Sequence, residues 1–166
     1  MAEIRIVDVT EQFERMDDVR ALFTEYAREI GIDLGFQGFE QELAELPGCY
    51  EAPHGVILLA ETDGQLAGCV ALRPLEDRIA ELKRMYVRPE HRGRGIAGRL
   101  ADEIISRALQ AGYSSIRLDT LAVMTAARGL YERLGFTRIE SYYNNPLPDV
   151  AYYELKFSRG REPTDN

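Results

Sequence analysis

The chain of 166 residues has few cysteines, no long apolar run and no excess of positive charge. Cys49 and Cys69 are too few for a disulfide framework, and no spacing of histidine and cysteine is typical of a zinc site. We therefore expect no metal ion, and we expect the protein in a reducing compartment, the cytoplasm.

Membrane insertion and nucleic-acid binding are not expected from this composition either. No apolar run approaches the length of a membrane span, and residues 1–5 lack the start of a secretory signal. The net charge of −8 disfavours nucleic acid as a partner, because phosphate backbones bind basic surfaces. An acidic surface instead suits a cationic amine as substrate.

What the chain does contain is the pattern of one α+β domain. Apolar residues make up 45% and charged residues 29%, which is ordinary for a globular protein with its own core. The periodicities predict a mixed, mainly antiparallel sheet flanked by helices, in the order β-α-α-β-β-β-α-β-α-β-β. We expect one domain over residues 1–157 and a polar tail over 158–166. The expected strands are 4–7, 56–61, 66–72, 79–87, 115–118, 136–140 and 152–157, and the expected helices are 17–30, 39–46, 95–111 and 125–134.

The most informative segment is a glycine-rich loop between a strand that ends at Val87 and a helix that begins near Gly95. The first amides of a helix have no acceptor within it, and glycines let a phosphate approach the backbone closely. The segment therefore predicts an anion site. Five arginines are expected to add a local positive field around this loop, namely Arg84, Arg88, Arg92, Arg94 and Arg99.

The same glycines allow a dinucleotide site as an alternative. Gly93, Gly95 and Gly98 satisfy G-x-G-x-x-G, and Asp119 lies downstream, where that motif has a ribose-binding acid. In a dinucleotide fold the glycines follow the strand directly, whereas residues 88–92 intervene here. The preceding strand also carries charged residues, and only one strand–helix–strand unit is visible. The context favours a different phosphate ligand, with a purely structural glycine turn as the minor alternative.

Two motifs resemble those of the GNAT superfamily of N-acetyltransferases. Arg92-Gly93-Arg94-Gly95-Ile96-Ala97 fits the pattern Arg/Gln-x-x-Gly-x-Gly/Ala of its pyrophosphate loop, and Ala127 to Phe136 is similar to A-x-x-L-Y-x-x-x-G-F. The predicted order of elements also resembles this family over nearly the whole chain. The resemblance implies direct transfer of an acetyl group from acetyl-CoA to a primary amine of a small molecule or a protein. A non-catalytic acyl-CoA sensor, and an acyltransferase with another donor or acceptor, are the alternatives.

The resemblance also implies how acetyl-CoA is held. The backbone of Met85, Tyr86 and Val87 would bind the pantetheine as an added strand does, and the Val87 amide would stabilise the oxyanion. The hydroxyl of Tyr131 would protonate the departing thiolate, although a tyrosine on a helix is also commonly a core residue. Met124 stands where the family often has asparagine, so a coenzyme contact is lost or replaced there. The expected pyrophosphate-binding residues are Arg92, Gly93, Arg94, Gly95, Ile96 and Ala97.

Glu81 is the candidate base that deprotonates the amine. It lies on the strand that leads into the glycine loop, and burial of a carboxylate raises its pKa toward neutrality. Some members of the family have a glutamate six residues before the last residue of this strand, and Glu81 and Val87 have the same spacing. The alternatives are an ion pair of Glu81 with Lys83 or an arginine, and a chain of water molecules as the base.

Two segments are candidate walls of the acceptor site. The first wall comprises Asp33, Phe36, Gln37 and Phe39, and the second comprises Tyr142, Tyr143 and Asn144, because an acid with aromatic rings suits an amine that has an apolar part. Packing of these aromatics within their own loops is the alternative. His54 and His91 are expected at the surface rather than in catalysis, and pairing of the late strands across a homodimer is left open.

Overall fold

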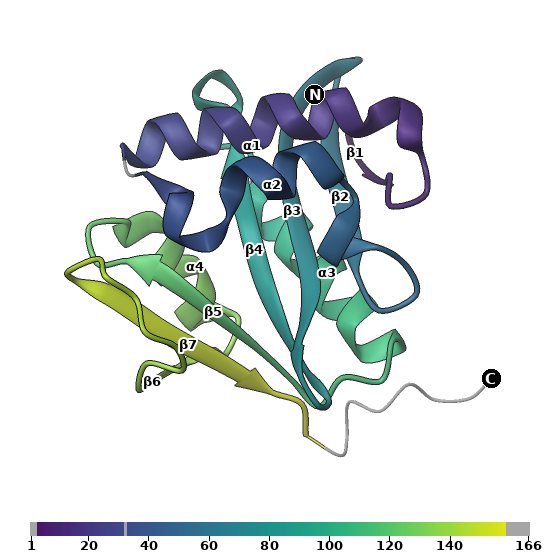
Figure 1. Cartoon of the computed structure of the whole chain (residues 1–166). Coiled ribbons are helices and arrows are strands. Elements are labelled where there is room, and N and C mark those ends of the chain that lie inside the picture. The colour runs from purple at the N-terminus through teal and green to yellow at the C-terminus, as the bar shows by residue number, and fades with distance from the viewer. Residues whose placement is uncertain (1–2, 32, 159–166) are drawn as a thin grey trace.

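The computed structural model describes residues 3–31 and 33–158 (Figure 1). The side chain of Phe36 lies outside this description, and so does the predicted tail from residue 159 onward. The single-domain boundary at residue 157 therefore stays a prediction.

The predicted order of strands and helices is confirmed. Seven strands form one sheet in the order β1-β2-β3-β4-β5-β7-β6, in which only β4 and β5 run parallel. The elements are β1 (Ile4–Asp8), α1 (Met16–Ile30), α2 (Phe39–Glu45), β2 (Val56–Thr62), β3 (Gln65–Glu76), β4 (Ile79–Val87), α3 (Ile96–Gln110), β5 (Ser115–Leu121), α4 (Thr125–Arg133), β6 (Thr137–Ile139) and β7 (Val150–Lys156).

Some boundaries differ from those expected. The hairpin between β2 and β3 turns at Asp63 and Gly64, both with positive φ, as an Asp-Gly turn requires. However, β3 continues through Pro74 to Glu76, where a turn was expected. The register shifts between Pro74 and Glu76, and proline is tolerated in a strand beside such an irregularity. The expected loop at 32–39 also contains a short 3-10 helix, Leu34–Gln37.

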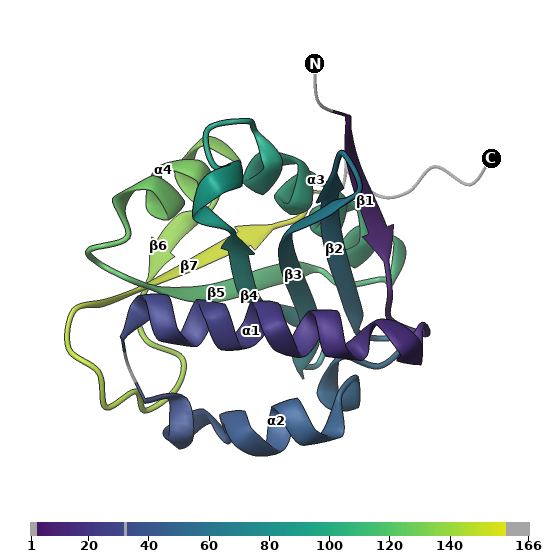
Figure 2. The same cartoon turned by 90° about the horizontal axis from the view of Figure 1, so that it is seen from above.

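Helices cover both faces of the sheet (Figure 2). On one face, Leu22 and Phe23 of α1 pack with Ile57 and Leu59 of β2. The other face is covered by Leu100 and Ile104 of α3 and Tyr131 of α4. They belong to one core cluster with Leu58 of β2 and Leu72 of β3. Since β2 is covered on both sides, its apolar run from 56 to 60 is continuous rather than alternating.

The sheet opens between β4 and β5. These strands pair only from Ile79 with Ser115 to Glu81 with Arg117, and then diverge (Figure 1). Arg84 has a positive φ of 60°, and the β3–β4 register shifts beside it, so β4 bulges where it leaves β5. In the part of the chain that the structure describes, the second half of β4 therefore has no strand partner on its β5 side.

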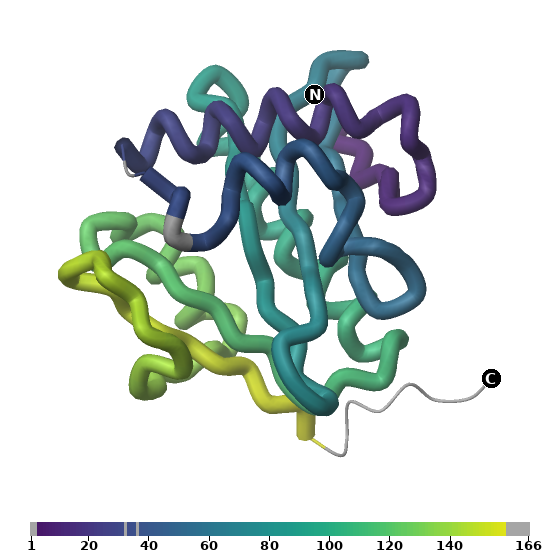
Figure 3. The backbone as a smooth tube through the Cα atoms, in the orientation of Figure 1, coloured from purple at the N-terminus to yellow at the C-terminus, as the bar shows by residue number. Residues whose placement is uncertain are grey.

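The backbone trace shows which segments border this opening (Figure 3). The segment between α1 and α2 and the loop between β6 and β7 both lie on this side of the molecule, and both contribute residues to the cleft described below. None of the helices that the structure describes is long and apolar enough to cross a bilayer.

Candidate active site

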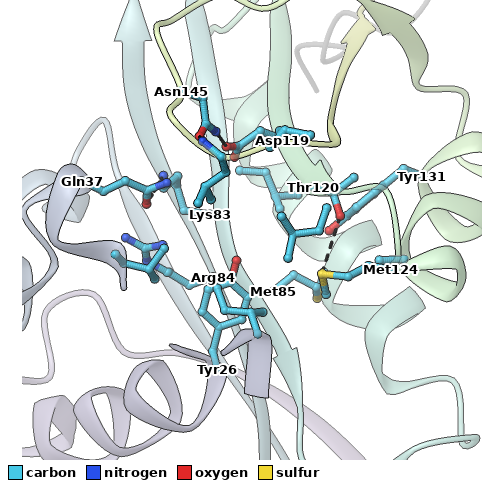
Figure 4. Close-up of a pocket in the computed structure, with 17 residues that line it drawn as sticks. Tyr26, Gln37, Lys83, Arg84, Met85, Asp119, Thr120, Met124, Tyr131 and Asn145 are labelled. Carbon is cyan, nitrogen blue, oxygen red and sulfur yellow. Dashed lines mark hydrogen bonds between the residues drawn. The ribbon is translucent and has the colours of Figure 1, made fainter. Parts of the chain in front are cut away.

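A cleft lies where β4 and β5 separate (Figure 4). Its walls come from β4, β5, α1, α4, the segment between α1 and α2, and the loop between β6 and β7. The lining includes Tyr26, Gln37, Lys83, Arg84, Met85, Asp119, Thr120, Met124, Tyr131 and Asn145.

The glycine loop presents free backbone amides beside this opening. Gly93 and Gly95 both have φ of 80°, and α3 begins directly after Gly95 without a side-chain cap. The first helical bond here runs from the Arg99 amide to the Gly95 carbonyl at 3.1 Å. Among the described residues, no acceptor is recorded for the amides from Gly93 to Gly98. Such amides at a helix N-terminus form an anion site.

The arginines contribute less to this site than the sequence predicts. Arg92 donates to the Val87 carbonyl at 2.9 Å and pairs with Glu29 at 2.6 Å. Arg88 pairs with Glu25, and Arg84 forms a bidentate pair with a glutamate of α2 rather than reaching the loop. The local positive field expected from five arginines is therefore reduced, because glutamates of α1 and α2 neutralise three of them. Arg94 is exposed and makes no ion pair within the described part of the chain.

The end of β4 offers its backbone to the cleft. The Arg88 amide donates to the Ala67 carbonyl at 2.8 Å, and Val87 stands opposite Gly68 in register. Hydrogen bonding alternates along an antiparallel pair, so the Val87 amide points away from β3, toward the opening. Gly68 permits the close approach of these strands, because a Cβ there would lie 2.6 Å from the Tyr86 carbonyl oxygen. The Tyr86 side chain itself packs with the α1 side of the core, and only Met85 of this trio lines the cleft with its side chain.

Tyr131 extends from α4 into the cleft (Figure 4). Its ring packs on Phe136, with centroids 5.6 Å apart, and the residue is 4% exposed. Within the described structure no hydrogen-bond partner is recorded for its hydroxyl. Burial, together with the charges of Tyr26 and Asp119, raises the pKa of Tyr131 above its usual value. The phenol therefore keeps its proton at neutral pH and has it available to donate.

Glu81 is buried, but both of its carboxylate oxygens are engaged. Arg73 of β3 reaches Oε1 at 2.7 Å, and the Tyr142 hydroxyl donates to Oε2 at 2.7 Å. Lys83 lies farther away, with Nζ 3.9 Å from Oε1. The carboxylate does not line the cleft. These contacts are those of the ion-pair alternative, and the role of Glu81 as base stays a prediction.

Two charged residues that the sequence analysis did not place in the acceptor site face each other in the cleft. Lys83 is 8% exposed and donates to Gln37 Oε1 at 3.1 Å. Asp119 accepts hydrogen bonds from the Tyr143 hydroxyl and from Asn145 Nδ2. The available signal was the presence of a lysine and an aspartate within otherwise buried strands, where an unpaired charge is costly.

The predicted acceptor walls are only partly brought together. Asp33 is exposed, caps the 3-10 helix through the Gly35 amide at 2.8 Å, and does not line the cleft. Gln37 of the predicted wall lines the cleft together with Leu34, whereas Phe39 does not. Tyr142 and Tyr143 lie beside the cleft and pack edge-on against Tyr152.

The two histidines also differ from each other. His54 is exposed, as expected, whereas His91 is 6% exposed, so its placement at the surface was wrong. It ends the short 3-10 helix Pro89–His91, which turns its side chain into the protein.

The sequence model of the Acetyltransferase (GNAT) family matches residues 16–136, most of the chain. The chain belongs to the GNAT acetyltransferase family. It is thus an acyl-CoA-dependent acetyltransferase, as the two motifs predicted. An uncharacterized N-acetyltransferase of Schizosaccharomyces pombe is 43% identical over 146 residues, with 87% of this chain and 90% of that protein covered. N-acetylaspartate synthetase of Danio rerio is 32% identical over 145 residues, or 82% of this chain, which spans 51% of that longer protein.

Solved structures share the fold of this GNAT protein. A GNAT acetyltransferase of Staphylococcus aureus has a TM-score of 0.77 at 20% identity, covering 93% of this chain and 99% of that one. A GNAT acetyltransferase of Elizabethkingia anophelis with acetyl-CoA bound has a TM-score of 0.54 at 21% identity, covering 62% and 76%.

Proposed function

We propose that this GNAT protein transfers an acetyl group directly from acetyl-CoA to a primary amine. The observation that carries the proposal is the occurrence of three features together: the free amides from Gly93 to Gly98 in the loop that follows β4, the unpaired edge of β4, and Tyr131 in the lining of the cleft. Together they offer contacts to a pyrophosphate, to an extended chain with amide groups and to a sulfur atom.

In the proposed reaction the chain's own groups act at three points. The amine nitrogen, once deprotonated, attacks the thioester carbonyl, and the Val87 amide donates to the oxygen on which negative charge develops. The carbon–sulfur bond then breaks, and Tyr131 gives its proton to the thiolate. The proton that the nitrogen loses as it becomes the amide balances the one that Tyr131 gives up. Confinement of both substrates between β4 and β5 supplies much of the rate through proximity.

Removal of a proton from the substrate ammonium is the least supported step of the proposed reaction. The sequence analysis names Glu81 as the base, with a chain of water molecules as the alternative. The engagement of both Glu81 oxygens by Arg73 and Tyr142 supports the alternative.

Among acceptors, a small-molecule amine is supported more than a protein amine. The cleft is bordered by two segments of the chain, and one relative carries the name N-acetylaspartate synthetase, which denotes a small-molecule product. The test is release of free thiol from acetyl-CoA with a panel of amines, beside calorimetric binding of the coenzyme. Coenzyme binding without turnover of any amine would contradict acetyl transfer.

A further inference from the structure

The charges around the cleft are not all neutralised by one another. Arg84 is satisfied by a bidentate pair with Glu42, at 3.0 and 2.9 Å, and Glu81 is satisfied by Arg73. Lys83 and Asp119 are different. The structure records no hydrogen bond or ion pair between them. Among the described residues, Lys83 has only a long ion pair with Glu81, at 3.9 Å, and Asp119 has no recorded ion pair.

The ammonium of Lys83 has no anion at hydrogen-bonding distance among the described residues. Its hydrogen-bond acceptor is the neutral amide oxygen of Gln37. Oε1 of Glu81 lies 3.9 Å from the ammonium, and Arg73 binds this same carboxylate oxygen at 2.7 Å. Burial of an ammonium without a close anion is unfavourable, which is why burial lowers the pKa of Lys83. An ammonium has three donors, so a carboxylate in the cleft would gain strong hydrogen bonds there.

The carboxylate of Asp119 accepts hydrogen bonds only from neutral groups among the described residues. Tyr143 and Asn145, both neutral donors, bind the same oxygen, Oδ2. No donor among the described residues is recorded for Oδ1. This oxygen has the chemistry to accept a hydrogen bond from a substrate ammonium.

The two groups stand on opposite walls of one opening. Lys83 extends from β4 and Asp119 from β5, beyond the last paired residues of these strands (Figure 4). A ligand between them meets a cation on one side and an anion on the other.

We propose that the acceptor is an amino acid held as a zwitterion, with its ammonium on Asp119 and its carboxylate on Lys83. This inference rests on the proposed acetyl transfer and names the substrate class for it. A protein amine or a simple alkylamine would satisfy Asp119 and leave Lys83 without an anion, whereas a polyamine would bring a second cation toward Lys83.

The test compares L-amino acids with their own primary amides. The amide keeps the shape and the amino group and loses the carboxylate charge. We expect the wild-type protein to favour the acid over the amide in kcat/KM by roughly a hundredfold, because an unpaired buried charge penalises the wrong ligand.

Lys83→Met should abolish this preference. Methionine has a similar volume, and replacing a buried charge with an apolar group is tolerated by folding. We expect the acid-to-amide ratio to fall to within about threefold of unity, with coenzyme affinity retained. Lys156→Met, which removes an exposed lysine of β7, is the matched control and should leave the ratio unchanged. Asp119→Asn should lower kcat/KM for acid and amide alike, since both carry the ammonium.

The outcomes separate this inference from the proposed function. Equal use of acids and amides by the wild-type protein, or a preference that survives Lys83→Met, would overturn the zwitterion site and leave acetyl transfer standing. Absence of thiol release with every amine tested, including polyamines and a peptide N-terminus, would overturn acetyl transfer and this inference with it.

Discussion

The Tyr142 hydroxyl donates a hydrogen bond to Oε2 of Glu81 at 2.7 Å, across 61 positions of the sequence. Arg73 holds the other oxygen of the same carboxylate. This contact ties the loop between β6 and β7 to the one stretch where β4 and β5 still pair. It stabilises the closed end of the cleft, and it also restrains the carboxylate that the sequence predicts to be the base.

The first prediction concerns the anion site. Gly98 lies in the first turn of α3, a Cβ there would meet no atom within 4 Å, and its φ is not positive. Gly98→Glu should fold, because an acid near a helix N-terminus is favourable. It should weaken acetyl-CoA binding by about tenfold or more, because it places a negative charge beside the pyrophosphate. Calorimetry measures the affinity, and Gly98→Gln is the uncharged control. Equal affinities of the two variants would place the pyrophosphate elsewhere.

The second prediction concerns Tyr131. Tyr131→Phe removes only the hydroxyl, so coenzyme affinity should be kept while the rate of transfer falls by roughly tenfold to a thousandfold. Tyr113→Phe is the matched control. That hydroxyl donates to the His54 carbonyl at 2.6 Å, away from the cleft. Single-turnover rates for both variants decide the matter, and an unaltered rate for Tyr131→Phe would reduce Tyr131 to a packing residue.

The third prediction concerns Glu81. Glu81→Gln keeps the shape but weakens the contact with Arg73, so we expect a loss of about 1–3 kcal/mol in the free energy of unfolding. With both oxygens engaged in the wild type, the shape of the pH–rate profile should persist. Denaturant unfolding and pH–rate profiles of both proteins are the measurements. Activity of Glu81→Gln that returns only at high pH would restore Glu81 as the base.

The fourth prediction concerns alkaline stability. Burial and the charge of Glu81 raise the pKa of Tyr142 above its usual value. Its contribution to stability is therefore complete below the unfolded-state pKa of about 10 and is lost as the pH rises through the folded-state value. In that window one such tyrosine costs about 1.4 kcal/mol per pH unit. Urea unfolding at neutral and alkaline pH should show a shallower decline for Tyr142→Phe than for the wild type. Parallel declines would mean that Tyr142 does not hold its proton in the folded state.

The local features of this protein were determined by its sequence alone. The order of strands and helices follows from short-range periodicity, and the glycine loop is recognisable because its residues are adjacent in the chain. Tyr131 was identified in the same way, from a motif of consecutive residues. In each case the physical cause lies within a few residues: a helix start, a turn with positive φ, or an alternation of apolar side chains.

The pairing of charges was decided by the tertiary structure. Glutamates of α1 and α2 bind the arginines expected at the anion site, and Arg73 and Tyr142 bind the predicted base. Lys83 and Asp119, which the sequence analysis did not place in the acceptor site, are left facing the cleft. The reason is physical. A charge is paired or left free by what lies within a few ångströms of it, and in a folded sheet those neighbours come from strands and loops far away in the chain.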